Sequence, residues 1–288
     1  MQTIQKPLVR QGWLRALIYF VGVSVIIYIF SYFSAYIINE FKTGTEKGNQ
    51  TVFQFGIMYS LMGVLILVYT WFSRKFIDRK SFESLGFAWK GYKNEAGLGF
   101  FIALALLGIG SVILIAIGYL AFIAANFDAG GLLAEVVIMI AVAFTEELLF
   151  RGYLLNNLMQ SVNKWGALSI TAALFSLFHG SNPDITLFAV VNIFLAGILL
   201  GINYIFTKNL WFSIFFHFSW NFFQGPVLGY DVSGLKLTSL LQQSKSGPEA
   251  WTGGPFGFEG SLLCPLLIIV AVLIFAYAFI KRYEQQQL

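Results

Sequence analysis

Long runs of apolar residues dominate this chain, and short polar segments separate them. A helix needs roughly 20 apolar residues to cross a bilayer, and several of the runs reach or exceed that length. The pattern predicts eight membrane-spanning helices, to within several residues at 13–38, 52–73, 96–125, 132–158, 165–180, 185–206, 209–225 and 261–280. No strand pattern or internal repeat is evident. We therefore expect an all-α fold, a polytopic membrane helical bundle of about eight transmembrane helices.

The composition excludes an ordinary soluble protein, because 58% of the residues are hydrophobic and only 11% are charged. Soluble domains carry roughly 25% charged residues. Membrane lipid is therefore the expected surrounding of the chain. The net charge of +4 gives no reason to expect a nucleic-acid partner, so none is predicted. A single cysteine, Cys264, excludes an intramolecular disulfide.

The distribution of lysine and arginine predicts the orientation in the membrane, because short cytoplasmic loops are enriched in these residues. With eight spans, 13 basic residues fall on the side of both termini and four fall on the other side. The four are Lys42, Lys47, Lys236 and Lys245. We therefore expect an integral, multi-pass membrane protein with both termini in the cytoplasm. The first apolar run is longer than that of a cleavable signal peptide, which favours a signal anchor.

The chain is expected to have two parts. Residues 1–95 hold two generic helices and a basic cytoplasmic segment, and residues 96–288 hold the part with unusual polar residues. The loop 226–260 is rich in glycine, proline and serine, and its sequence indicates no chemical role.

Three of the apolar helices contain strong polar groups at similar depth. Glu146 lies about 18 Å from the cytoplasmic end of its helix, His179 about 22 Å and His217 about 12 Å, at 1.5 Å per residue. Asn221 follows His217 by four residues and shares its helix face. Ionisable residues inside a membrane are functional candidates. We therefore predict one site built from Glu146, His179, His217 and Asn221.

Each of these residues also has a structural interpretation. A single intramembrane histidine or asparagine often only makes a hydrogen bond between helices. Glu147 and Arg151 stand at i and i+4, so they can pair on one face and hold the helix in place. Glu146 points about 100° away from Glu147 and has no such partner. The coincidence of four polar groups at one depth favours a site over isolated packing contacts.

The polar residues form three motifs, each on its own apolar helix: Glu146-Glu147…Arg151, Phe175…His179 and His217…Asn221. In this order they resemble the CAAX protease and bacteriocin-processing (CPBP, or Abi) family of intramembrane endopeptidases. The resemblance covers residues 80–280 and implies a protease, a hydrolase, with a cavity that opens toward the cytoplasm. It also implies a membrane-associated peptide or protein substrate, with or without a lipid anchor.

The resemblance implies a role for each motif residue. Glu146 activates the attacking water, and His179 helps to hold that water. His217 and Asn221 stabilise the oxyanion of the tetrahedral intermediate. Glu147 and Arg151 give structural support.

The need for a metal stays open at this point. Glu146, His179 and His217 supply a donor set that suits Zn²⁺, and the family is often called an intramembrane metalloprotease. In that case Glu146 becomes a ligand and another base is required. There is no His-Glu-x-x-His helix in the sequence. We favour a metal-independent glutamate mechanism and commit no residue to a metal.

Two other functions fit the same residues. A membrane transporter could use the buried glutamate and histidines as a proton relay, although such proteins usually contain an internal repeat. A non-catalytic immunity or scaffold protein could also be built on this bundle. The intact set of motifs favours the protease.

Overall fold

A computed structural model describes residues 6–40 and 52–284 of the chain. Helical segments occupy every range that the hydropathy pattern predicts. The long helices are α1 (Gly12–Glu40), α2 (Val52–Phe72), α3 (Lys93–Ala116), α4 (Ala129–Glu147), α6 (Lys164–Phe178), α7 (Leu187–Thr207), α8 (Trp211–Phe222) and α10 (Leu263–Glu284). The short ones are η1 (Ser73–Ile77), η2 (Phe82–Leu85), η3 (Leu148–Leu155), α5 (Asn156–Leu158), η4 (Phe223–Val227), α9 (Glu249–Thr252), η5 (Gly254–Phe256) and η6 (Phe258–Gly260).

Within the described residues, five helices are long and apolar enough to cross a membrane. They are Gly12–Tyr36, Gly56–Ile77, Lys93–Ala116, Leu187–Thr207 and Leu263–Arg282. The apolar helix α6 is shorter. The prediction of an integral membrane protein made of helices is thus confirmed, whereas the count of eight spans stays a prediction.

The predicted helical fold is confirmed for most of the described residues, but the sequence did not indicate a two-stranded sheet at one end of the bundle. Strand β1 (Leu120–Ala125) pairs antiparallel with β2 (Leu241–Lys245). The span expected to run from 96 to 125 therefore ends at Ala116, just before Gly118, whose φ of +75° takes the chain out of the helix. The partner strand of β1 lies more than a hundred residues further along the chain, so no local pattern could reveal it.

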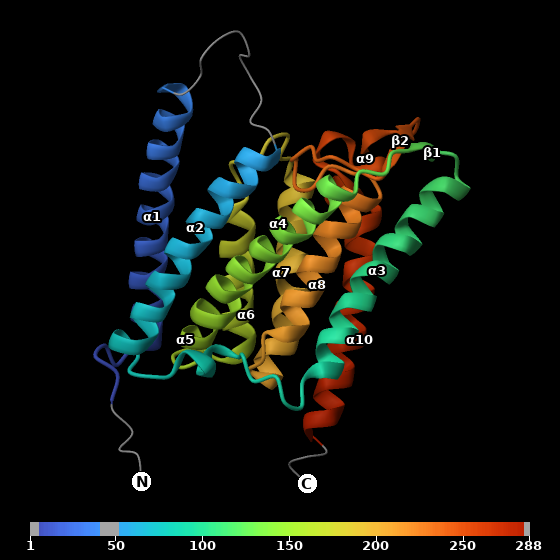
Figure 1. Cartoon of the computed structure of the whole chain (residues 1–288). Helices are drawn as coiled ribbons and strands as arrows, with labels where there is room; N and C mark the ends of the chain where they lie inside the picture. Colours follow the sequence, from blue (N-terminus) through green and yellow to red (C-terminus); the bar gives the residue numbers. More distant parts are fainter. Residues whose placement is uncertain (1–5, 41–51, 285–288) are drawn as a thin grey trace.

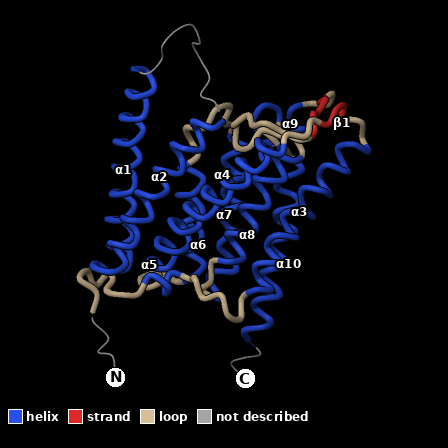
Figure 2. Tube along the Cα trace, in the orientation of Figure 1, coloured by secondary structure: helices blue, strands red, loops and turns tan. Residues whose placement is uncertain are grey.

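The helices form a single bundle whose two ends differ (Figure 1). The start of α1 and the last turn of α10 lie at one end, which we call the Gly12 end. The two strands and α9 lie at the opposite end, which we call the sheet end (Figure 2). Helices α1 and α2 lie on one side of the bundle, α3 and α10 on the other, and α7 and α8 between them.

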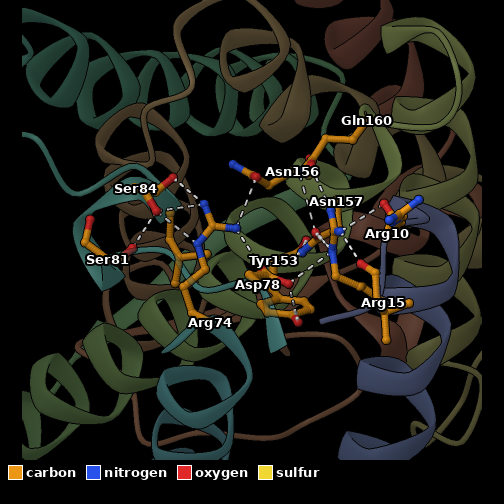
Figure 3. Close-up of polar contacts among 12 residues, drawn as sticks. Arg10, Arg15, Arg74, Asp78, Ser81, Ser84, Tyr153, Asn156, Asn157 and Gln160 are labelled. Carbon is orange, nitrogen blue, oxygen red and sulfur yellow. Dashed lines mark hydrogen bonds and ion pairs between the residues drawn. The ribbon is translucent and has the colours of Figure 1, made fainter. Parts of the chain in front are cut away.

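A buried ionic cluster joins α1 to the rest of the bundle near the Gly12 end (Figure 3). We call it the Asp78 cluster. Arg15 Nε lies 3.1 Å from Asp78 Oδ1, and Arg74 Nη1 lies 2.7 Å from Asp78 Oδ2. Tyr153 donates to Oδ1 at 3.1 Å and Asn157 to Oδ2 at 3.2 Å. Asp78 Oδ2 therefore has two donors, whereas Oδ1 has one donor and the ion-pair contact with Arg15, whose Nε–H is donated to Asn157 Oδ1 at 2.8 Å.

The remaining donors of the two arginines are also used. Arg15 Nη2 donates to Gln160 Oε1 at 2.7 Å and Nη1 to the carbonyl of Val9 at 2.6 Å. Arg74 Nε and Nη2 donate to the hydroxyl of Ser84. Arg15 and Arg74 are among the 13 basic residues used to predict orientation, yet the structure buries both of them. They lie at the expected end of the bundle, but inside the protein.

Candidate active site

The two glutamates stand where α4 ends and the π-helix η3 begins. Short π-helical turns inside α-helices frequently occur at functional sites. Arg151 lies within η3, and its Nη1 donates to Glu147 Oε1 at 2.8 Å. Its Nη2 donates to the carbonyl of Gly197 on α7 at 3.0 Å. The predicted ion pair is present, and it also fastens α4 to α7.

Glu147 has a second partner that the sequence did not indicate. His217 Nδ1 lies 2.9 Å from the same Oε1 atom of Glu147. A carboxylate can only accept, so Nδ1 carries the proton and donates. The Nε2 atom of His217 is then the ring nitrogen left to face Glu146. Glu147 therefore sets the orientation of one of the predicted site residues.

His179 lies just past the end of α6, as the residue that follows Phe178, and not inside a helix as expected. Its Nδ1 lies 2.8 Å from the carbonyl of Phe175. A carbonyl only accepts, so Nδ1 donates here too and Nε2 is left for the site. The Phe175 ring packs against the His179 ring at 4.8 Å, as the i, i+4 spacing predicts, and against Arg151 at 4.5 Å.

Glu146 lies between the two imidazoles. Its Oε2 atom is 3.8 Å from His179 Nε2 and 3.9 Å from His217 Nε2. This buried oxygen has no hydrogen-bond partner among the described residues. Separations of this size are too long for direct hydrogen bonds but can be bridged by a water molecule. The structure thus brings Glu146, His179 and His217 together around one point.

Asn221 lies one turn after His217 on α8 and lines the same cavity as the other three predicted residues. The cavity has a volume of about 270 Å³. Most of its remaining wall is apolar, with Met139, Val142, Phe178, Ile193, Leu200, Phe216 and Ile268. A mainly apolar pocket with a few convergent polar groups is typical of a binding or active site.

The loop 226–260, to which the sequence assigned no role, forms part of this cavity. It contributes Val232, Ser233, Leu235, Leu237 and Glu259 to the wall. Glu259 holds the loop in place, because it accepts hydrogen bonds from Trp220 Nε1 at 3.0 Å and from Ser233 Oγ at 2.6 Å. The backbone carbonyl of Glu259 also accepts from Asn192 on α7. Nothing in the local sequence signals this contribution.

Tyr59 is a further residue of the site that the sequence did not indicate. It lies on α2, which the hydropathy pattern treats as a generic span, and its hydroxyl donates to Glu146 Oε1 at 2.8 Å. Tyr59 also lines the cavity. The available signal was weak, since Tyr59 and Ser60 are two hydroxyl residues of an apolar run, between the glycines 56 and 63.

The fit of a zinc ion can be judged from the donor atoms. Zinc binds oxygen and nitrogen ligands at about 2.0–2.2 Å, so neighbouring donors in a tetrahedral site lie roughly 3.3 Å apart. Glu146 Oε2 is 3.8 and 3.9 Å from the two Nε2 atoms. In the described part of the chain, no three His, Cys, Asp or Glu side chains are arranged to hold a metal ion. The residues as placed do not fit a bound zinc.

Residues 128–223 match one protein-family model, type II CAAX prenyl endopeptidase Rce1-like. The matched segment contains all seven residues of the three motifs and runs from just before α4 to the end of α8. No curated protein matches the chain. The family match confirms the resemblance to the CAAX protease family, and it supports an intramembrane protease of the CAAX type as the general class.

Proposed function

We propose that this protein is an intramembrane endopeptidase that hydrolyses a peptide bond of a membrane-associated substrate with a water activated by Glu146. One observation carries the proposal: the Oε2 atom of Glu146, which has no hydrogen-bond partner in the described part of the chain, lies within 4 Å of two imidazole nitrogens in a mainly apolar cavity. A buried carboxylate oxygen without a donor is costly unless a ligand or water completes it.

In the first step, Glu146 Oε2 takes a proton from water as the water oxygen attacks the peptide carbonyl carbon. His179 holds the water, because its Nδ1 proton is committed to the carbonyl of Phe175 and its Nε2 lone pair is left to accept. Glu146 then returns the proton to the amine that leaves. The same carboxyl group thus serves as base and then as acid.

His217 and Asn221 are placed to stabilise the oxyanion formed by the attack. His217 Nδ1 already donates to Glu147, so Nε2 donates to an oxyanion when the ring carries both protons. Because Arg151 already balances Glu147, the negative charge of the oxyanion itself balances the charge of this ring. The side-chain amide of Asn221, one turn along α8, supplies the second donor. Donors held in advance around a developing charge are worth roughly 3–4 kcal/mol each.

The substrate we propose is a peptide segment at or within the membrane. The apolar cavity wall suits hydrophobic side chains or a lipid chain attached to the peptide, and this wall reaches the catalytic group. We also propose that the reaction uses no metal, because the donor spacing does not form a three-ligand site. A tight chelator should then leave the purified enzyme fully active, whereas loss of activity that added Zn²⁺ restores would overturn this part.

We propose that the Gly12 end faces the cytoplasm. Lys80, Lys164 and Lys208 lie near one another at this end. Burial, and then the charges of Lys164 and Lys80, lower the pKa of Lys208 to about 8. Lys42 and Lys47 of the opposite side lie outside the described residues. A reporter protein that works only in the cytoplasm should therefore be active when it is fused after Leu288. The division of the chain at residue 95 remains a prediction, although Tyr59 from the first part reaches the site.

The experiment that tests the function compares membrane proteins from cells with the wild type and with Glu146→Gln. Peptide fragments that require the intact glutamate identify the substrate and the cleaved bond. A fragment pattern unchanged by Glu146→Gln, with the variant present in the membrane at normal amounts, would overturn the protease. The transporter and the non-catalytic scaffold would then be the hypotheses to test.

A further inference from the structure

We propose that Tyr59 is a positioning residue of the active site, and that α2 is held against α4 so that its hydroxyl can orient Glu146. This inference rests on the proposed role of Glu146 as the base. The Tyr59 hydroxyl donates to Glu146 Oε1 at 2.8 Å, while Glu146 Oε2 lies between the nitrogens of His179 and His217. The hydrogen bond therefore fixes the rotation of the carboxylate, so that its free oxygen faces the imidazoles.

A carboxylate has two equivalent oxygens, and rotation about its last bond has broad, shallow minima. A fixed donor on one oxygen removes this freedom. Of the two oxygens of Glu146, only Oε1 has a hydrogen-bond donor among the described residues, and that donor is Tyr59. A phenylalanine ring would fill the same space without holding the carboxylate. The hydroxyl, and not the ring, carries the proposed role.

The packing of α2 on α4 explains how the hydroxyl reaches the carboxylate. Gly56 and Gly63 stand three residues before and four residues after Tyr59, so all three share one face of α2. A Cβ at Gly56 would lie 2.5 Å from Ile138 Cδ1, and one at Gly63 would lie 2.8 Å from Thr145 Oγ1. Small residues let two membrane helices approach closely. Here they bring Tyr59 to Glu146.

The contact joins two regions that sequence reasoning separates. Thr145, against which Gly63 packs, directly precedes Glu146. Tyr59 lies outside the segment 128–223 that matches the family. The active site therefore includes a residue of the N-terminal helices, and α2 is part of the catalytic unit.

Steady-state kinetics of the purified full chain test this inference, with a fluorogenic prenylated peptide that ends in a Cys-aliphatic-aliphatic-X sequence as the probe. Tyr59→Phe should lower kcat roughly 10- to 100-fold, the value of one hydrogen bond to a charged group, and leave KM unchanged. Gly63→Ala should lower kcat in the same way, because the new methyl group pushes α2 away from Thr145. The matched control is Gly108→Ala on α3, where an added Cβ meets no atom within 4 Å. This control should keep wild-type kinetics.

The double variant separates positioning from general loosening of the fold. If both changes act through one hydrogen bond, adding Tyr59→Phe to Gly63→Ala should lower kcat little further. The double variant should then have nearly the same kcat as Gly63→Ala alone. If the fold-changes in kcat of the two single variants multiply in the double variant, the proposal is overturned. A change in KM alone would also overturn it. Full activity of Tyr59→Phe would also overturn it. Inactive Glu146→Gln together with fully active Tyr59→Phe would remove this inference alone, whereas fully active Glu146→Gln would remove the proposed function.

Infrared spectroscopy gives a readout that needs no turnover. The carboxylate stretching band that disappears in Glu146→Gln belongs to Glu146, and removal of the donor in Tyr59→Phe should shift this band. A band at the wild-type position would show that the hydroxyl does not bind the carboxylate, and this result would overturn the inference even if the probe peptide were not cleaved.

Discussion

Two groups of buried charged residues in this protein differ in how completely they are hydrogen-bonded. In the Asp78 cluster both oxygens of the aspartate accept hydrogen bonds and contact an arginine, and Arg15 and Arg74 donate their other N–H groups to carbonyl, amide and hydroxyl oxygens. In the site around Glu146, one oxygen each of Glu146 and Glu147 has no hydrogen-bond partner among the described residues.

Hydrogen bonding distinguishes structural from functional charged groups inside this membrane protein. A buried ion needs several hydrogen bonds to offset the loss of water, and a fully bonded cluster has nothing left to offer a ligand. A buried carboxylate with an unused oxygen keeps a place for water or substrate. Burial alone would not separate the two groups, because Asp78 and Glu146 are both more than nine-tenths buried.

Glu146→Gln gives the strongest test of the difference between the two groups. We expect the rate of peptide cleavage to fall by roughly 10⁴-fold, the upper range for loss of a general base, because glutamine cannot take the proton from water. The variant should remain folded and inserted in the membrane, since Glu146 accepts a single hydrogen bond from the described residues. Single-turnover rates and thermal unfolding in detergent measure the two effects. A variant that retains its rate contradicts the assignment of the base.

Asp78→Ala should give the opposite result. Both arginines would lose the one acid partner that they have among the described residues, and breaking such a buried pair costs about 3–5 kcal/mol. We expect a lower unfolding temperature and lower abundance in the membrane, with the activity per folded molecule close to wild type. If activity per folded molecule fell as far as in Glu146→Gln, the cluster would have to be counted as part of the site.

Asn221→Ala compares the loss of one oxyanion donor with the loss of the base. One missing oxyanion donor should lower kcat by roughly 10²- to 10³-fold and leave a measurable remnant. The unfolding temperature should change little. Complete loss of activity with intact folding would show that Asn221 does more than donate one hydrogen bond.

Glu147→Gln tests a residue that belongs to both kinds of group. Its Oε1 accepts from Arg151 and from His217. Glutamine keeps this oxygen but loses the charge that balances the buried Arg151, so the change should destabilise the fold by about 3–5 kcal/mol. We expect Glu147→Gln to unfold at a lower temperature than Glu146→Gln. The reverse order would mean that the structural and catalytic acids are exchanged.

The features that the sequence predicted by itself are those with a local signal. Apolar runs locate the helices because each run must satisfy its backbone hydrogen bonds internally. The spacing of four residues predicts the Glu147–Arg151 pair and the packing of Phe175 on His179, because these residues share a helix face. The candidate site itself was predicted from polar residues that have no reason to lie in apolar helices.

Only the tertiary structure decided the contacts between distant parts of the chain. Tyr59 and Glu146 are 87 residues apart and His217 and Glu147 are 70 apart, and both hydrogen bonds depend on how closely whole helices pack. The sheet, the cavity wall from the loop 226–260 and the burial of Arg15 and Arg74 have the same origin. Helix periodicity states which face of a helix is polar, but the neighbour of that face follows from the packing of all helices together, where a glycine such as Gly63 decides an approach of a few ångströms.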